Sequence, residues 1–553
     1  MQAALPLLFL LASAAARPLD IPFWRALDVR TDVVNASAFP GTNAELGGQQ
    51  VYFVPPAFSA MVEGTNHVSA AQQAAEATNA TSTNITTTSA TAAGNVTGSM
   101  GNNAIAPMLA MYYPDWLSKA FPPERLDFSR IDYIDFAFAV PQEDFTLDWD
   151  GSEDAPETLD RLVTMAHSKG KKVKVSVGGW SGSKHISPAV ASGDSRRTFV
   201  TNIVDLYHRH NLDGIDIDWE YPGQSGSNGN EIDGSDTANF LEFLRLLRSI
   251  LPPTATITAA AQTVPFAGSD GNALNDVRAF AEVLDWVLLM NYDVWGASAN
   301  PGSNAPLSDG CNNNSQPKAT ADAAIKQWMA AGFPANKLVL GLPSYGYVSS
   351  STATQLRQRG DNDMYPMSLS PPGLQSPPPP PIVAPPELGA ASAGISSSEA
   401  QSPATETVTV FVTAEPTPSS PSTTITSPTR EQEPSATVVS ILLRSEDSGQ
   451  IPFRDLITQG ALCASKSDST SEPAFIGCGG FERIWDACSS TPFLRSESAG
   501  QLVTYDDPDS IWLKATIAGA YGLRGVNFWD AYGDVDDWAL VDAARRGLGL
   551  GVQ

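Results

Sequence analysis

Three acidic residues at alternate positions mark the segment 213–220, which reads Asp-Gly-Ile-Asp-Ile-Asp-Trp-Glu. If this segment is a β-strand, Asp216, Asp218 and Glu220 share one face, because successive side chains of a strand point to opposite faces. The intervening Ile and Trp residues favour burial. Carboxylates crowded on a buried strand cost desolvation and like-charge repulsion unless some are protonated or serve a reaction. The pattern therefore predicts a proton-handling site; a strand whose acids face bulk water is the alternative.

Short apolar runs with strand character alternate with amphipathic helical stretches from about residue 106 onward, and these elements must position the acids. Repeated strand–helix units form parallel sheets, so the pattern predicts the α/β class and a (β/α)8 TIM barrel. A doubly wound open sheet is the alternative, but its usual Gly-rich phosphate turn is not found. The expected strands are 107–113, 131–140, 172–178, 214–220, 255–262, 286–292, 338–343 and 525–529, and the expected helices are 156–168, 196–209, 237–250, 319–331, 510–521 and 538–547.

Composition divides the chain into five parts. Residues 1–16 are a short apolar run ending in small residues, which predicts a secretory signal peptide. Residues 17–105 form an N-terminal extension that becomes a Ser/Thr/Asn-rich linker, and 106–349 hold the first part of the catalytic barrel. Residues 350–440 are rich in Pro, Ser and Thr and predict a disordered low-complexity insertion between strand seven and the closing helix. Residues 441–553 are expected to complete the barrel.

Charge and sequence motifs restrict the partners and the compartment. A net charge of −27 argues against a nucleic-acid partner, because phosphate binding needs a positive surface. No segment after residue 16 has about 18 consecutive apolar residues, so we expect no membrane span, and we expect a secreted, extracellular monomer. No metal or other cofactor is expected, since Cys and His spacing supports no metal site. Five Asn-x-Ser/Thr sequons predict a glycoprotein: Asn35, Asn79, Asn84, Asn95 and Asn313.

Four cysteines allow three disulfide pairings in an oxidising compartment. We favour Cys463–Cys478 as a local link across a short loop. Cys311–Cys488 would then join the loop after strand six to the segment before the closing helix. Sequence alone leaves the other pairings open.

Other expected strand ends carry aromatic and polar residues. Active sites of TIM barrels lie at the carboxyl ends of the strands, so these residues are expected near Glu220. Each alone has a structural alternative, because a Trp near a strand end is more often core than ligand. The candidates are Tyr112 and Trp116 after strand one, Trp180 after strand three, Met290, Tyr292 and Asp293 after strand six, and Trp529 after strand eight.

Together these motifs resemble the family 18 glycoside hydrolases, the chitinases and their relatives, over about 106–348 and 440–551. Segment 481–494 is most similar to secreted fungal chitinases. Many members carry an ordered α+β insertion after strand seven; here that position holds the low-complexity segment and a cysteine-bearing remnant, which leaves the cleft depth open. The family motif D-x-x-D-x-D-x-E matches at Asp213, Asp216, Asp218 and Glu220 and continues in Tyr221, S-x-G-G matches at Ser176, Gly178 and Gly179, and M-x-Y-D matches at Met290, Tyr292 and Asp293.

The resemblance implies substrate-assisted, retaining catalysis, in which the substrate's own N-acetyl oxygen is the nucleophile. Glu220 would protonate the glycosidic oxygen. Asp218 would bind the acetamide N–H and share a proton with Asp216, and Tyr292 would donate to the acetamide oxygen. Asp213 is expected to be structural. The expected substrate-binding residues are Trp529 as the floor, Tyr112, Trp116 and Trp180 as stacking faces, and Tyr221, Met290 and Asp293.

The resemblance thus predicts a secreted chitinase that hydrolyses β-1,4 bonds of N-acetylglucosamine polymers or oligomers, with chitin or a chitooligosaccharide as its partner. An endo-β-N-acetylglucosaminidase acting on N-glycans would keep every motif and is the main alternative. A chitin-binding lectin on the same barrel is a weaker alternative, because family lectins often lose the acid and Glu220 is present.

Overall fold

The computed structural model describes the backbone of strands within 25–54 and, in more detail, residues 106–314, 316–357, 440–466 and 473–551. The expected signal peptide, most of the linker and most of the 350–440 insertion lie outside the described residues.

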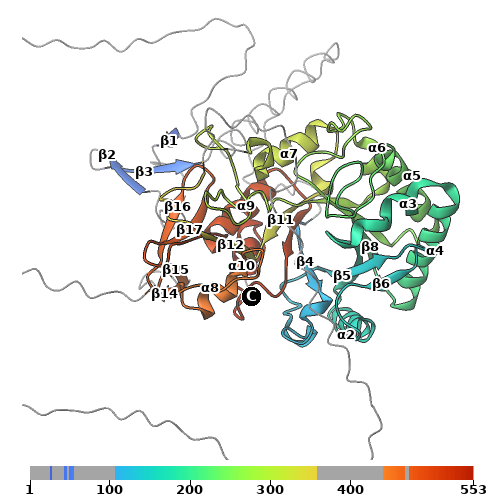
Figure 1. The fold of residues 1–553 in the computed structure, drawn as a ribbon, viewed down its shortest axis with the longest axis horizontal. Helices are drawn as coiled ribbons and strands as arrows, with labels where there is room; N and C mark the ends of the chain where they lie inside the picture. The colour runs from blue at the N-terminus through green and yellow to red at the C-terminus, as the bar shows by residue number, and fades with distance from the viewer. Residues whose placement is uncertain are drawn as a thin grey trace, which may run out of the picture. The chain divides into compact units, whose positions relative to one another are not determined.

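Eight parallel strands close into a barrel, which confirms the predicted TIM fold (Figure 1). The sheet order is β4-β19-β11-β10-β9-β8-β7-β5, and a β4–β5 pairing closes the ring. The short β6 (Leu147–Trp149) pairs antiparallel with β5. The barrel strands are β4 (Met108–Pro114), β5 (Tyr133–Pro141), β7 (Lys172–Gly178), β8 (Gly214–Asp218), β9 (Thr256–Ala261), β10 (Trp286–Leu289), β11 (Leu338–Pro343) and β19 (Gly525–Trp529).

All six expected helices are present. Local capping sets several of their starts: Ser192 and Ser195 form a capping box at α4, as Asp507 and Ser510 do at α9. Within the described ranges, none of the helices is long and apolar enough to cross a membrane. The helices around the barrel are α2 (Ala155–Ser168), α3 (Ile186–Ala191), α4 (Gly193–Arg209), α5 (Asp236–Ile250), α6 (Arg278–Val283), α7 (Ala321–Ala330), α9 (Pro508–Ala520) and α10 (Ala539–Gly547). Short 3-10 helices are η2 (Asp115–Leu117), η3 (Pro123–Arg125), η4 (Gly182–His185), η5 (Pro317–Ala319) and η6 (Ala335–Lys337).

Alternate residues of each strand belong to two separate cores. On β8, Ile215 and Ile217 are fully buried in the cluster that packs strands against helices. A second cluster fills the barrel interior and includes Tyr112. Asp216 lies on that interior side, because the Tyr112 hydroxyl bonds to it. The predicted alternation is therefore present within β8, and it turns Asp216 into the barrel.

An ordered α+β layer follows β11, where composition indicated only a cysteine-bearing remnant. Its five-stranded antiparallel sheet has the order β13-β12-β18-β17-β16, and Figure 1 shows β16, β17 and α8 in orange beside the barrel. The low-complexity segment separates β12 from the other strands in the sequence, which hides the sheet from local patterns. The elements are β12 (Tyr345–Ser350), β13 (Gln450–Pro452), α8 (Phe453–Thr458), β14 (Leu462–Lys466), β15 (Pro473–Gly477), β16 (Glu482–Asp486), β17 (Thr491–Ser496) and β18 (Gln501–Thr504).

A separate three-stranded antiparallel sheet lies within the predicted N-terminal extension. It consists of β1 (Arg25–Leu27), β2 (Asn43–Leu46) and β3 (Gln49–Val54), with β3 in the centre. The weak periodicity of this region did not predict these strands.

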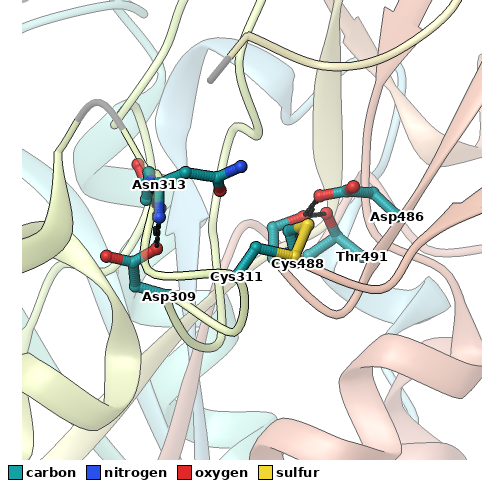
Figure 2. Close-up of a disulfide and its surroundings, with 8 residues drawn as sticks. Asp309, Cys311, Asn313, Asp486, Cys488 and Thr491 are labelled. Atoms are coloured by element: carbon teal, nitrogen blue, oxygen red, sulfur yellow. Dashed lines mark hydrogen bonds between the residues drawn. A yellow bond between two sulfur atoms is a disulfide. The ribbon is translucent and has the colours of Figure 1, made fainter. Parts of the chain in front are cut away.

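Two disulfides link the described cysteines in the predicted pairing, Cys311–Cys488 and Cys463–Cys478. Figure 2 shows Cys311 in the loop before α7 joined to Cys488 in the turn between β16 and β17. Near Cys311, Asp309 accepts the N–H of Asn313 at 2.9 Å. The first disulfide thus ties the loop after β10 to the α+β layer.

The double variant Cys311→Ser/Cys488→Ser is expected to lose more unfolding free energy than Cys463→Ser/Cys478→Ser. Cross-links act mainly by restricting the unfolded chain, and their effect grows with the enclosed loop. The sequence separations of 177 and 15 residues correspond to about 5 and about 3 kcal/mol. Urea unfolding followed by tryptophan fluorescence measures both losses, and an equal or larger loss in the second variant would contradict this ranking.

Candidate active site

Asp216 lies at the centre of a hydrogen-bond network inside the barrel. Its Oδ2 accepts hydrogen bonds from the Tyr112 hydroxyl at 2.9 Å and the Ser176 hydroxyl at 2.8 Å. Its Oδ1 accepts a short hydrogen bond from the Thr258 hydroxyl. The side chain is 1% exposed. Three converging donors from β4, β7 and β9 satisfy this buried carboxylate.

A buried ion pair lies next to this network. Lys174 Nζ is 2.8 Å from Asp135 Oδ1 and 3.9 Å from Asp216 Oδ1, and Asn527 donates to Asp135 Oδ2 at 2.8 Å. Burial raises the pKa of Asp135 to about 6, while Lys174 opposes the rise. Lys174, Asp135, Asn527 and Thr258 are not among the predicted site residues. The sequence feature that could have identified each of them is a polar residue on the inward face of an otherwise apolar strand.

Asp218 differs from Asp216 in its surroundings. It is 4% exposed, yet its Oδ1 has no hydrogen-bond partner among the described residues. Burial raises the pKa of Asp218 well above its usual range, and the negative charges of Glu220 and Asp216 raise it further. A buried, unsatisfied carboxyl oxygen in a site of this kind fits a donor supplied by a ligand.

Glu220 lies two residues beyond the end of β8, so the strand is shorter than the predicted 214–220. The backbone turns here because Ser183 Oγ accepts the Glu220 N–H at 2.9 Å and Asn230 donates to the Glu220 carbonyl at 3.0 Å. Burial raises the pKa of Glu220 to about 7; a hydrogen bond from Tyr221 lowers it and the charge of Asp293 raises it. A carboxyl group with this pKa is well placed for general acid catalysis near neutral pH.

The backbone conformation of the Ser-x-Gly-Gly segment requires its two glycines. Gly178 and Gly179 have φ values of 114° and 89°, which favour glycine. A Cβ on Gly178 would lie 2.2 Å from the carbonyl oxygen of Asp218, and Gly179 N donates to that oxygen at 2.8 Å. This close approach holds β7 against the end of β8, directly before the acid.

Tyr292 and Asp293 follow β10, which ends at Leu289 instead of the predicted residue 292. Asp293 has a φ of 56°, so the chain turns there, in the loop that follows the strand. Asp293 Oδ1 accepts hydrogen bonds from the hydroxyls of Tyr345 and Tyr347, each at 2.6 Å. Both tyrosines come from β12 in the α+β layer, which therefore forms part of the site. Burial raises the pKa of Asp293, while the two tyrosine hydrogen bonds oppose the rise.

Aromatic rings line the same end of the barrel. Trp529 lies with its ring centroid 5.0 Å from Tyr112, 5.6 Å from Phe138 in a stacked arrangement and 6.4 Å from Trp116. Trp116 is 42% exposed and can offer a free face. These rings form a platform suited to the apolar faces of sugars.

The remaining predicted residues are Trp180, Tyr221, Met290 and Asp213. Trp180 contacts the ring of Tyr221 at a centroid distance of 6.5 Å, and Tyr221 in turn bonds to Glu220. Met290 packs against the interior cluster. Asp213 accepts the Val173 N–H at 2.9 Å and lies 2.8 Å from His167 Nε2, on the strand's N-terminal side and away from the candidate acid.

Known proteins resemble this chain in sequence and in fold. Residues 108–534 match the model of the Glycosyl hydrolases family 18, a range that includes every candidate residue. A chitinase-like effector from Moniliophthora roreri is 31% identical over 81% of this chain and 94% of its own length, and one from Moniliophthora perniciosa is 31% identical over 83% and 91%. The crystal structure of a chitinase from Rhizomucor miehei has 27% identity and a TM-score of 0.55, over 80% of this chain and 99% of that chain. The chain belongs to the family 18 glycosyl hydrolases.

Proposed function

We propose that this protein hydrolyses the β-1,4 bonds of N-acetylglucosamine polymers or oligomers by substrate-assisted, retaining catalysis. The observation that carries the proposal is the pairing of Glu220, whose pKa is raised to about 7, with the buried, unpartnered Oδ1 of Asp218. Glu220 supplies a proton at neutral pH, and Asp218 Oδ1 accepts a hydrogen bond from the N–H of the substrate.

In the first step, protonated Glu220 transfers its proton to the glycosidic oxygen as the bond between that oxygen and C1 breaks. The acetamide carbonyl oxygen of the same sugar forms the new bond to C1 and closes an oxazolinium ion. Asp218 accepts the acetamide N–H, and the negative charge that it shares with Asp216 stabilises the positive charge that develops there, while Tyr292 donates to the acetamide oxygen. Trp529 forms the floor beneath this sugar.

In the second step, water attacks C1 and the ring reopens. The Glu220 carboxylate takes the proton of that water, which restores the acid. Two inversions at C1 leave the product in the β configuration. Trp116 and Trp180 would stack with neighbouring sugars along the chain.

Two alternatives remain distinct in class. An endo-β-N-acetylglucosaminidase would use the same residues on the core of an N-glycan. A protein that binds chitin oligomers without cleaving them is suggested by the name of the Moniliophthora relatives, chitinase-like effectors. The acid Glu220 and its pKa of about 7 favour hydrolysis over binding alone.

One incubation separates these functions. The full-length protein is mixed with chitin hexamers and, separately, with a high-mannose glycoprotein, and the products are analysed by mass spectrometry. We expect shorter oligomers from the hexamer and an intact glycan on the glycoprotein. Glycan release alone would support the N-glycan activity, and bound but uncleaved hexamer would support the binding function.

We also propose secretion. The apolar segment 1–16 ends in small residues, and both disulfides fit an oxidising compartment.

The basic limb of kcat/KM against pH is expected near the Glu220 pKa of about 7, because the acid must be protonated in the free enzyme. Tyr221→Phe removes a hydrogen bond to the carboxylate, so the limb should move to higher pH. Asp293→Asn removes a negative charge that favours the protonated form, so the limb should move to lower pH. Initial rates on a soluble chitin oligomer across pH 4 to 9 measure both. Shifts in the same direction would contradict this assignment of the acid.

A further inference from the structure

Lys174 is a buried cation that the mechanism above does not use. Its side chain is fully buried inside the barrel on β7, and the Trp286 ring lies 4.7 Å from Nζ. Bulk solvent therefore does not reach the ammonium group, and it contacts protein groups. These are Asp135 Oδ1 at 2.8 Å and the Thr258 hydroxyl, which accepts a short hydrogen bond from Nζ.

The hydrogen bonds run in one direction from Lys174 to Asp216. An ammonium group only donates, so the Thr258 oxygen must accept from it. The single hydroxyl proton of Thr258 is then free to point to Asp216 Oδ1, where the structure places the bond. Tyr112 and Ser176 donate to the other oxygen. A carboxyl group that receives donors at both oxygens is stabilised as the anion.

Asp216 and Asp218 differ in the charged groups that surround them. Lys174 compensates one carboxylate, Asp135, and is only 3.9 Å from the second, Asp216. Among the described residues, no such cation contacts Asp218; burial and the charges of Glu220 and Asp216 raise its pKa, so Asp218 is the member of the pair that holds a proton. The titratable groups facing Asp216 are Tyr112 on β4, Asp135 on β5, Lys174 on β7, Asp218 on β8 and Tyr292 after β10.

We propose that Lys174 is a positioning residue for the reaction: acting through Thr258, it keeps Asp216 ionised, so that the proton shared by the two aspartates rests on Asp218. The negative charge of Asp216 then lies beneath the sugar on which the oxazolinium ion forms. This inference rests on the proposed function. It adds Lys174 and Thr258 as the residues that set the charge of the Asp216–Asp218 pair.

The sharpest test replaces Thr258, which leaves the Lys174–Asp135 ion pair in place. Thr258→Val keeps the shape and removes the hydroxyl, whereas Thr258→Ser keeps the hydroxyl. For Thr258→Val we expect a loss of about tenfold in kcat, with KM within about twofold, and an acidic limb of kcat/KM about one pH unit higher. Thr258→Ser should retain the wild-type limb. Equal limbs in the two variants would overturn the proposal.

A second set of variants separates the relay from simple neutralisation of Asp135. Asp135→Asn/Lys174→Met removes both charges of the pair and so leaves no uncompensated carboxylate. If Lys174 acts through Thr258, the acidic limb of this double variant stays above that of the wild type. An acidic limb at the same pH as in the wild type would mean that Lys174 only neutralises Asp135. The control is Lys171→Met, which breaks a partly exposed pair with Asp132 at 3.2 Å and should leave the profile unchanged.

A titration of the Asp carboxyl carbons by 13C NMR tests the network without relying on activity. The Asp216 signal, assigned with Asp216→Asn, should titrate at higher pH in Thr258→Val than in the wild type or Thr258→Ser. Identical midpoints in all three proteins would refute the relay. If the wild type cleaves no substrate, the proposed hydrolysis fails, and the NMR titration still decides the question of the network.

Discussion

Glu220→Gln is expected to reduce kcat on chitin oligomers by about 10²–10⁴-fold or more while oligomer binding stays within a few fold of wild type. Gln has the size of Glu and can keep the backbone contacts to Ser183 and Asn230. It has no proton to give to the glycosidic oxygen. Reducing-end assays measure turnover, and isothermal titration calorimetry measures the affinity for a chitin tetramer.

The matched control is Glu231→Gln, the same substitution at a residue that pairs with His185 at 3.4 Å and has a side chain 54% exposed. It should behave as wild type in both assays. Activity of Glu220→Gln within tenfold of wild type would mean that another group is the acid. Loss of both turnover and binding would indicate a local structural change in place of a lost proton donor.

Substrates without the N-acetyl group at the sugar over Trp529 are expected not to be cleaved, whatever their affinity elsewhere in the cleft. The acetamide oxygen is the proposed nucleophile, so its removal deletes a reacting atom. A thiazoline analogue of the cyclised intermediate should inhibit competitively. Its affinity should fall in Asp218→Asn and Tyr292→Phe, because both side chains are proposed to contact the cyclised group.

Asp218→Asn is expected to lower kcat by about 10²–10³-fold with a much smaller change in substrate affinity. Asn cannot share a proton with Asp216, and the positive charge that the aspartate pair stabilises develops only as the oxazolinium ring closes, so the loss falls on the transition state. NMR of the first product should show the β anomer. Initial α product, or a covalent glycosyl ester on Glu220 or Asp218, would disprove substrate assistance and leave the barrel assignment intact.

Much of the barrel could be predicted because the information is local. The period-2 alternation of 213–220 fixed which acids share a face, and the strand–helix repeats located the eight barrel strands to within a few residues. The strand ends were less accurate. β8 and β10 stop before Glu220 and Tyr292, since side-chain contacts such as that of Ser183 replace the ladder there, and a strand pattern does not contain them.

The candidate acids and aromatics were predictable for the same reason: they lie in short motifs at strand ends. The antiparallel α+β layer was not, because β12 and β13 are adjacent in space but separated in sequence by the low-complexity segment. The hydroxyls of Tyr345 and Tyr347 reach Asp293 only through this layer.

The sequence by itself determined the type of barrel, the acidic face of β8 and the resemblance to the family; it favoured one disulfide pairing, which the structure confirms. Only the tertiary structure decided which polar residues meet inside the barrel. Asp135, Lys174, Thr258 and Asn527 come from four different strands, and each alone is one polar residue in an apolar run. Closure of the barrel brings them together beside Asp216, because the inward faces of neighbouring strands meet in the interior, where buried polar groups are stabilised by pairing with one another.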